Sequence, residues 1–132
     1  MILIIGPAYS GKREYAREFI TRQKSQLADG ETTMIECTAP DQGEESAGVL
    51  AEVQELVTEE MDEDALEALA DSLCERASVL TASETGAGIV PVGAGARRIR
   101  ENQGRLLQML ARRADSVVRV FYGIPEVIRG QV

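Results

Sequence analysis

Histidine and tryptophan are both absent from the 132 residues, and aromatic residues make up only 4% of the chain. Without histidine there is no imidazole to act as a general base, to bind a metal or to carry a phosphoryl or nucleotidyl group. Because aromatics are scarce, aliphatic side chains must fill the core. The length suffices for one core, so we expect residues 1–132 to form a single domain.

Long hydrophobic runs are also lacking. The N-terminal apolar stretch, residues 1–5, has no basic residue before it and leads directly into a glycine, whereas a membrane span needs about 20 apolar residues. We interpret this stretch as a buried strand and not as a signal peptide. The two cysteines, Cys37 and Cys74, are too far apart for a C-x-x-C site. This spacing favours reduced thiols in a cytoplasmic protein without a membrane span.

Positive charge is nearly missing from the middle of the chain. Residues 31–84 contain sixteen carboxylates and one base, Arg76, in a protein with a formal net charge of −8. Such an acidic segment argues against nucleic acid as a partner, because proteins gain that affinity by neutralising phosphates. The other basic residues lie in the two flanking segments, where we expect anions to bind.

The N-terminal segment contains the pattern of a phosphate-binding loop, G-x-x-x-x-G-K. Its residues are Gly6, Pro7, Ala8, Tyr9, Ser10, Gly11 and Lys12. In such a loop the glycines allow a sharp turn, successive backbone N–H groups face one phosphate, and the lysine reaches the outer phosphates. The helix expected from Gly11 adds the positive end of its dipole. The pattern therefore predicts a nucleoside triphosphate, GTP or ATP, as the cofactor.

The residue after the lysine departs from the usual motif. A serine or threonine there would place its hydroxyl on Mg²⁺, but this chain has Arg13, which donates hydrogen bonds and cannot coordinate a metal. Three alternatives remain open. Mg²⁺ is held without this ligand, or the guanidinium takes part of its charge-neutralising role, or Arg13 points to solvent and the loop binds phosphate poorly.

Hydrophobic periodicity predicts alternating strands and helices. We expect strands at 1–5, 32–37, 78–83 and 116–122, a short hairpin return over 123–129, and helices at 11–26 and 97–114. Two acidic amphipathic helices are expected between residues 47 and 77, the first carrying Val49, Leu50, Val53, Leu56 and Val57, the second Leu66, Leu69, Ala70, Leu73 and Cys74. This order predicts an α/β class, a three-layer P-loop NTPase-like fold with a mostly parallel sheet and a C-terminal hairpin strand.

Further candidate site residues follow the predicted strands. Glu36 could contact a base or a water on Mg²⁺, or it could be an exposed carboxylate at a strand end. The glycine-rich stretch 84–95 leaves another strand, either as a site wall or as a structural turn. Arg97, Arg98 and Arg100 could meet a phosphorylated substrate or could be solvated helix arginines.

Three segments resemble the bifunctional adenosylcobinamide kinase / adenosylcobinamide-phosphate guanylyltransferase family of cobalamin biosynthesis. They are MILIIGPAYSGK (1–12), MIEC (34–37), and ETGAGIVP (84–91) with GRLLQMLARRADSVVRVFYGIP (104–125). The resemblance implies that the loop binds the triphosphate for the kinase step and that Glu36 contacts the guanine nucleotide. It makes Lys12 and Glu36 the catalytic candidates, and it implies a corrinoid precursor as substrate and a homo-oligomeric assembly.

The chain also departs from this family. The family's histidine carries GMP covalently, so guanylyl transfer by that route is excluded. Asp29-Gly30 leads almost at once into the strand expected at Thr32, so the segment that would hold the family's second strand and this histidine is missing; Leu107 replaces a family asparagine.

Two main functions remain open. One is an NTP-dependent kinase in which Glu36 or Glu84 orients a corrinoid hydroxyl. The other is a catalytically inactive relative that acts as a binding or assembly subunit. An unrelated small-molecule kinase is a third, more distant alternative.

Overall fold

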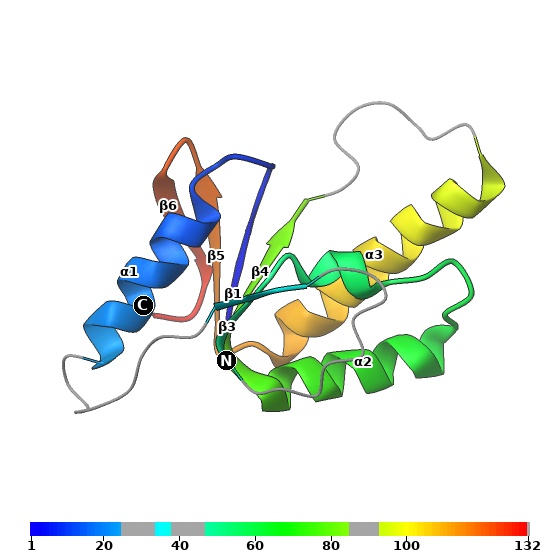
Figure 1. Cartoon of the computed structure of the whole chain (residues 1–132), viewed down its shortest axis with the longest axis horizontal. Helices are drawn as coiled ribbons and strands as arrows, with labels where there is room; N and C mark the ends of the chain where they lie inside the picture. The colour runs from blue at the N-terminus through cyan, green and yellow to red at the C-terminus, as the bar shows by residue number, and fades with distance from the viewer. Residues whose placement is uncertain (25–33, 38–46, 85–92, 132) are drawn as a thin grey trace.

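A computed structural model of the chain describes residues 1–24, 34–37, 47–84 and 93–131. Strands and helices alternate along the chain for most of its length (Figure 1). The elements are β1 (Ile2–Gly6), α1 (Lys12–Lys24), β2 (Met34–Glu36), β3 (Ala47–Ala51), the 3-10 helix η1 (Val53–Leu56), α2 (Glu63–Arg76), β4 (Ala77–Ser83), α3 (Ala94–Arg113), β5 (Ser116–Phe121) and β6 (Ile124–Arg129).

The strands form one sheet of six in the order β2-β3-β4-β1-β5-β6. Neighbouring strands from β2 to β5 are parallel, and β6 returns antiparallel to β5. This arrangement confirms the predicted α/β class, the mostly parallel sheet and the C-terminal hairpin strand. Because β1 lies between β4 and β5, the loop that follows β1 leaves the sheet near its middle.

Helices cover both faces of the sheet and make it the middle of three layers. Helix α1 lies on one face, and α2 and α3 lie on the other (Figure 1). Within β1, Ile2 and Ile4 belong to the apolar cluster that includes Ala16 and Ile20 of α1, whereas Leu3 belongs to the cluster shared with α2 and α3. Successive residues of a strand point to opposite faces, so a strand covered on both faces is apolar throughout.

The first predicted acidic helix is wrong. Val49 and Leu50 lie in strand β3, whereas Val53 and Leu56 lie in the short helix η1 and Val57 caps its C-terminal end. Val49 packs in the cluster on the α1 face, and Leu50, next to it in the chain, packs in the cluster on the α2 and α3 face. One stripe of a helix cannot present two adjacent residues in opposite directions. The run GVLA is a strand buried on both faces, and it lacks the alternation that would have distinguished it from a helix.

The other helices agree with the predicted stripes. In α2, Leu66, Ala70 and Leu73 are buried, and Asp62 caps the helix by accepting a hydrogen bond of 2.8 Å from the backbone N–H of Ala65. In α3, Leu106, Met109 and Leu110 are buried. The helix begins three positions before the predicted start at Arg97. Cys37 is buried and Cys74 is partly buried. None of the helices in the described ranges is long and apolar enough to cross a membrane.

Candidate functional site

The loop between β1 and α1 makes a tight turn that requires its two glycines. At Gly6 (φ +158°) a Cβ atom would lie 2.3 Å from the carbonyl oxygen of Val120. At Gly11 (φ +96°) a Cβ atom would meet the Cα of Gly123 at 3.1 Å. Any side chain at either position would push the loop away from the β5–β6 hairpin. The sequence pattern G-x-x-x-x-G-K therefore has the compact backbone that a phosphate loop needs.

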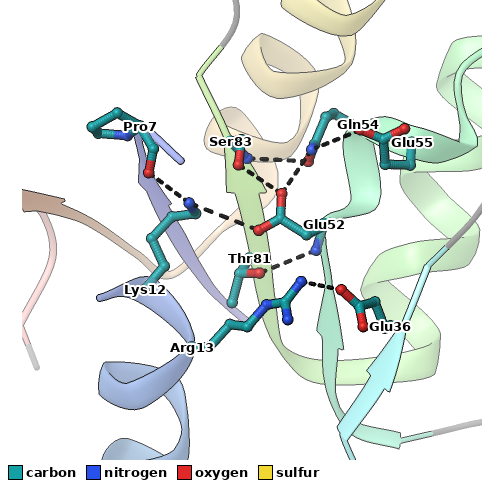
Figure 2. A network of polar contacts seen from close by, with 9 residues as sticks. All are labelled: Pro7, Lys12, Arg13, Glu36, Glu52, Gln54, Glu55, Thr81 and Ser83. Atoms are coloured by element: carbon teal, nitrogen blue, oxygen red, sulfur yellow. Dashed lines mark hydrogen bonds and ion pairs between the residues drawn. The ribbon is translucent and has the colours of Figure 1, made fainter. Parts of the chain in front are cut away.

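Lys12, the first residue of α1, extends over this loop. Its side-chain Nζ donates a hydrogen bond of 2.8 Å to the carbonyl oxygen of Pro7 and lies 3.7 Å from Oε1 of Glu52 (Figure 2). The residue is only 4% exposed. Burial lowers the pKa of the Lys12 ammonium below its ordinary value, and the nearby charge of Arg13 lowers it further, against the opposing effect of Glu52.

A second buried polar group lies in the same loop. The side-chain oxygen of Ser10 is buried and has no hydrogen-bond partner within the described residues. Buried hydroxyl groups are nearly always hydrogen-bonded in folded proteins. The loop thus contains an unsatisfied hydroxyl at Ser10 as well as the desolvated ammonium of Lys12.

Glu52, which the sequence analysis did not single out, faces Lys12 from the end of β3. Its Oε2 atom accepts hydrogen bonds from Oγ of Ser83 at 2.6 Å and from Nε2 of Gln54 at 2.7 Å (Figure 2). Burial alone would raise the pKa of this carboxyl. The hydrogen bonds from Ser83 and Gln54, with the charges of Lys12 and Arg13, outweigh burial and hold the pKa below its ordinary value. Glu52 is therefore a fixed negative charge beside the loop lysine.

The backbone of Glu52 is strained as well. The residue adopts a left-handed conformation, with φ 59° and ψ 50°, and its N–H donates a hydrogen bond of 3.1 Å to Oγ1 of Thr81. Non-glycine residues in this region carry a conformational cost and cluster at functional sites. Glu52 directly follows the apolar run of β3. Assigning that run to a strand would have placed the carboxylate of Glu52 at the carboxyl ends of the parallel strands, next to the loop.

Arg13 and Glu36, both predicted site residues, form an ion pair. The guanidinium Nη2 of Arg13, in the first turn of α1, binds Oε1 of Glu36 at the end of β2 (Figure 2). Both side chains are partly exposed, 40% for Arg13 and 57% for Glu36. The structure thus places Arg13 against a carboxylate at the edge of the site and does not leave it in solvent alone.

A cavity of about 890 Å³ lies above the loop. Its lining includes most of the predicted site residues, from Ala8 to Arg13 and Glu36, together with Glu14, Cys37, Glu52, Gln54, Glu55 and Ser83. Gly6 and Pro7 belong to the loop but do not line the cavity. The cavity therefore brings the loop together with the carboxyl ends of β2, β3 and β4, where open parallel sheets bind ligands.

Other candidates either do not line the cavity or lie outside the described residues. Glu84 follows β4, and its carboxylate accepts two hydrogen bonds from Arg119 of β5, at 2.8 and 2.9 Å. Residues 85–92 of the glycine-rich stretch 84–95 lie outside the described residues. Arg98 pairs at 4.0 Å with Glu59, and neither it nor Arg97 and Arg100 contributes to the described cavity lining.

The parallel sheet and the glycine-rich loop between β1 and α1 define a P-loop α/β fold. The family described as cobinamide kinase / cobinamide phosphate guanyltransferase matches residues 23–128, so the chain belongs to this family. The match begins after the loop, and the loop pattern is therefore a separate observation that agrees with it.

The comparison with solved structures supports the fold alone. A structure from Pyrococcus horikoshii OT3, described as a structural study of a numbered project, is similar with a TM-score of 0.51 and 7% identity. The similarity covers 100% of this chain and 87% of that one. No curated protein matches the chain.

Proposed function

We propose that the chain binds the triphosphate of GTP or ATP at residues 6–13 and acts as a cobinamide kinase-like protein. The observation that carries this proposal is the desolvated ammonium of Lys12, which lies over a tight glycine loop at the start of α1 and opens onto the cavity. The unsatisfied hydroxyl of Ser10 supports it. Loop N–H groups and the positive end of α1 add to the attraction for phosphate.

Nucleotide binding would change the partners of Lys12. Its ammonium would exchange the carbonyl oxygen of Pro7 for phosphate oxygens, which carry more negative charge and form stronger hydrogen bonds. The carboxylate of Glu52 lies 3.7 Å from the ammonium of Lys12 and would be repelled by the entering phosphate. Its bonds from Ser83 and Gln54 hold this carboxylate in place while Lys12 turns to the nucleotide.

A kinase reaction at this site would transfer the γ-phosphoryl group to a hydroxyl of a corrinoid precursor. The hydroxyl oxygen would attack the γ-phosphorus, the bond to the β–γ bridging oxygen would break, and the nucleoside diphosphate would leave. The hydroxyl proton would pass to an oxygen of the transferred phosphoryl group and from there to solvent. Lys12 would stabilise charge on the transferred group. Glu36 remains a candidate for orienting the hydroxyl, but Glu52 lies nearer Lys12 and is less exposed. Because the pKa of Glu52 is lowered, it would orient the hydroxyl more than deprotonate it.

The binding step is tested by calorimetric titration of the protein with GTP and with ATP. We expect binding of at least one nucleotide and a loss of affinity of about tenfold or more in Lys12→Ala. Arg17→Ala is the matched control, because Arg17 lies one turn further along α1, is exposed and does not line the cavity. Equal affinities of Lys12→Ala and the unaltered protein would overturn the proposed site.

A catalytically inactive relative, acting as a binding or assembly subunit, is the second candidate. It is favoured by the complete absence of histidine, which excludes the covalent guanylyl step. Incubation with γ-labelled GTP or ATP and cobinamide distinguishes the two candidates. Label in the corrinoid product that disappears in Lys12→Ala supports the kinase. Nucleotide binding without any labelled product supports the binding subunit.

We also propose that the protein forms a homo-oligomer, with the β5–β6 hairpin as the contact. Apart from Tyr9, the exposed large hydrophobic residues in the described part of the chain all lie there, and they are Phe121, Tyr122, Ile124, Val127 and Ile128. The acidic helix α2 has no such residues, so it is a poorer candidate. Light scattering during gel filtration should show a multimer that Val127→Asp dissociates; a monomeric unaltered protein would contradict this proposal.

A further inference from the structure

Three strands that end beside the cavity are each followed or terminated by a glutamate, and each of these glutamates is bound by a basic side chain. The pairs are Glu36 with Arg13, Glu52 with Lys12, and Glu84 with Arg119. Parallel strands place their carboxyl ends at one edge of the sheet, so the three acids lie in a row there. The row is already neutralised by positive charges of the chain itself.

A P-loop fold implies Mg²⁺, and the residues present can be compared with what that ion needs. Mg²⁺ takes oxygen ligands, normally the hydroxyl after the loop lysine, carboxylates that hold it directly or through water, and the phosphates. Here the hydroxyl is replaced by the guanidinium of Arg13. No group of three or more acidic, cysteine or histidine side chains in the described ranges is arranged to hold a metal. These residues therefore lack the hydroxyl ligand of the usual magnesium site, and the carboxylates of Glu36 and Glu52 that line the cavity are already paired with Arg13 and Lys12.

Arg13 lies where its charge can act on the ligand. It lines the cavity in the first turn of α1, next to Lys12, and its guanidinium faces Glu36 across the cavity edge (Figure 2). Its charge also contributes to lowering the pKa of both Lys12 and Glu52, so its field reaches the two groups directly over the loop. A guanidinium presents a planar set of donors that matches phosphate oxygens.

We infer that the loop binds the nucleotide triphosphate without a divalent cation, with the Arg13 guanidinium in the place of Mg²⁺. This inference rests on the proposed nucleotide site. On binding, Arg13 leaves Glu36 and donates its hydrogen bonds to the outer phosphate oxygens, while Lys12 binds the same triphosphate. Glu36 then serves as the resting partner that keeps Arg13 at the cavity when the nucleotide is absent.

The test is calorimetry with ATP and with GTP, each in the presence of excess EDTA and in the presence of excess Mg²⁺. We expect the unaltered protein to bind with affinities that agree within about threefold in the two conditions. In EDTA, Arg13→Ser should lose about tenfold or more, and Mg²⁺ should restore part of the loss through the new hydroxyl. Arg13→Lys keeps the charge without the planar donors, so its affinity for nucleotide in EDTA should lie between those of the unaltered protein and Arg13→Ser.

Arg17→Ser makes the same chemical change one helical turn away and should leave both affinities unaltered. Thermal unfolding of Arg13→Ser checks that the variant is folded. The inference is overturned, and the nucleotide site stands, if the unaltered protein binds nucleotide only with Mg²⁺. The same follows if Arg13→Ser and the unaltered protein bind nucleotide equally well in EDTA. If no nucleotide binds in either condition, the proposed function itself fails.

Discussion

The backbone N–H of Gly123 donates a hydrogen bond of 2.7 Å to the carbonyl oxygen of Ser10. Ser10 belongs to the loop between β1 and α1, and Gly123 lies in the turn that joins β5 to β6. The same turn packs against Gly11, at which a Cβ atom would lie 3.1 Å from the Cα of Gly123. The C-terminal hairpin is therefore a support for the loop, and changes in the hairpin turn should reach the proposed nucleotide site.

Gly123→Ala tests this support. Gly123 has φ +73° with open space where the Cβ would be, so alanine there adds backbone strain without a clash. We expect the free energy of unfolding to fall by about 1 kcal/mol and nucleotide affinity to fall with it. Gly104→Ala, in α3 and equally free of clashes, should instead raise stability by about 0.5–1 kcal/mol. Urea unfolding measures both variants. If the free energy of unfolding changed in the same direction in both, the strained backbone assigned to Gly123 would be refuted.

Local patterns were sufficient to predict the loop and much of the fold. The loop residues are contiguous in the chain, and the strand before Gly6 and the helix after the loop have distinct periodicities. A short N-terminal stretch of sequence was therefore sufficient to predict the strand, the loop and the helix. The prediction missed strand β3 because burial on both faces removes the alternation of apolar and polar residues. In addition, a strand followed by the turn of η1 can imitate helical spacing, here at Val49, Val53 and Val57.

Contacts within the site depend on the sheet order, which the sequence does not state. Arg13 meets Glu36 across 23 positions, and Ser83 meets Glu52 across 31. Only the register of β3 beside β4 brings Ser83 to Glu52. The support of the loop by Gly123 likewise depends on how the hairpin returns. Sequence alone therefore located the loop that lines the cavity and missed the carboxylate of Glu52 that faces Lys12.

Asn102 should be one of the most sensitive polar residues of the structure. It is buried in α3, and its Nδ2 donates hydrogen bonds to the carbonyl oxygens of Thr58 (3.1 Å) and Met61 (3.0 Å). Asn102→Ala leaves both carbonyls without this donor and should lower the free energy of unfolding by about 1–3 kcal/mol. Gln108→Ala, at an exposed position of the same helix, should change it by less than about 0.5 kcal/mol. Equal losses in the two variants would contradict the assigned contacts.

Arg113 joins α3 to α2 through two carboxylates. Its guanidinium pairs with Glu67 and with Asp71, the latter at 2.9 Å, and these hydrogen bonds raise its pKa. The acids are partly exposed, so salt should screen the attraction. Arg113→Gln should therefore lower the thermal midpoint at low ionic strength by more than it does at about 1 M NaCl. A difference between the variant and the unaltered protein that is independent of salt would assign the effect to packing.

Glu52 should make the stability of the protein sensitive to acid. Its folded-state pKa lies below its ordinary value of 4.5, so the carboxylate contributes stability above that pH, and the contribution is lost as the pH falls through the folded-state pKa. Glu52→Gln has no proton to take up and should show a shallower decline in the free energy of unfolding between about pH 6 and about pH 3. Urea unfolding over this range measures the slope, with the exposed Glu60→Gln as the control. If Glu52→Gln declines as steeply as Glu60→Gln, the ion pair with Lys12 and the bonds from Ser83 and Gln54 do not hold the carboxylate in its charged form.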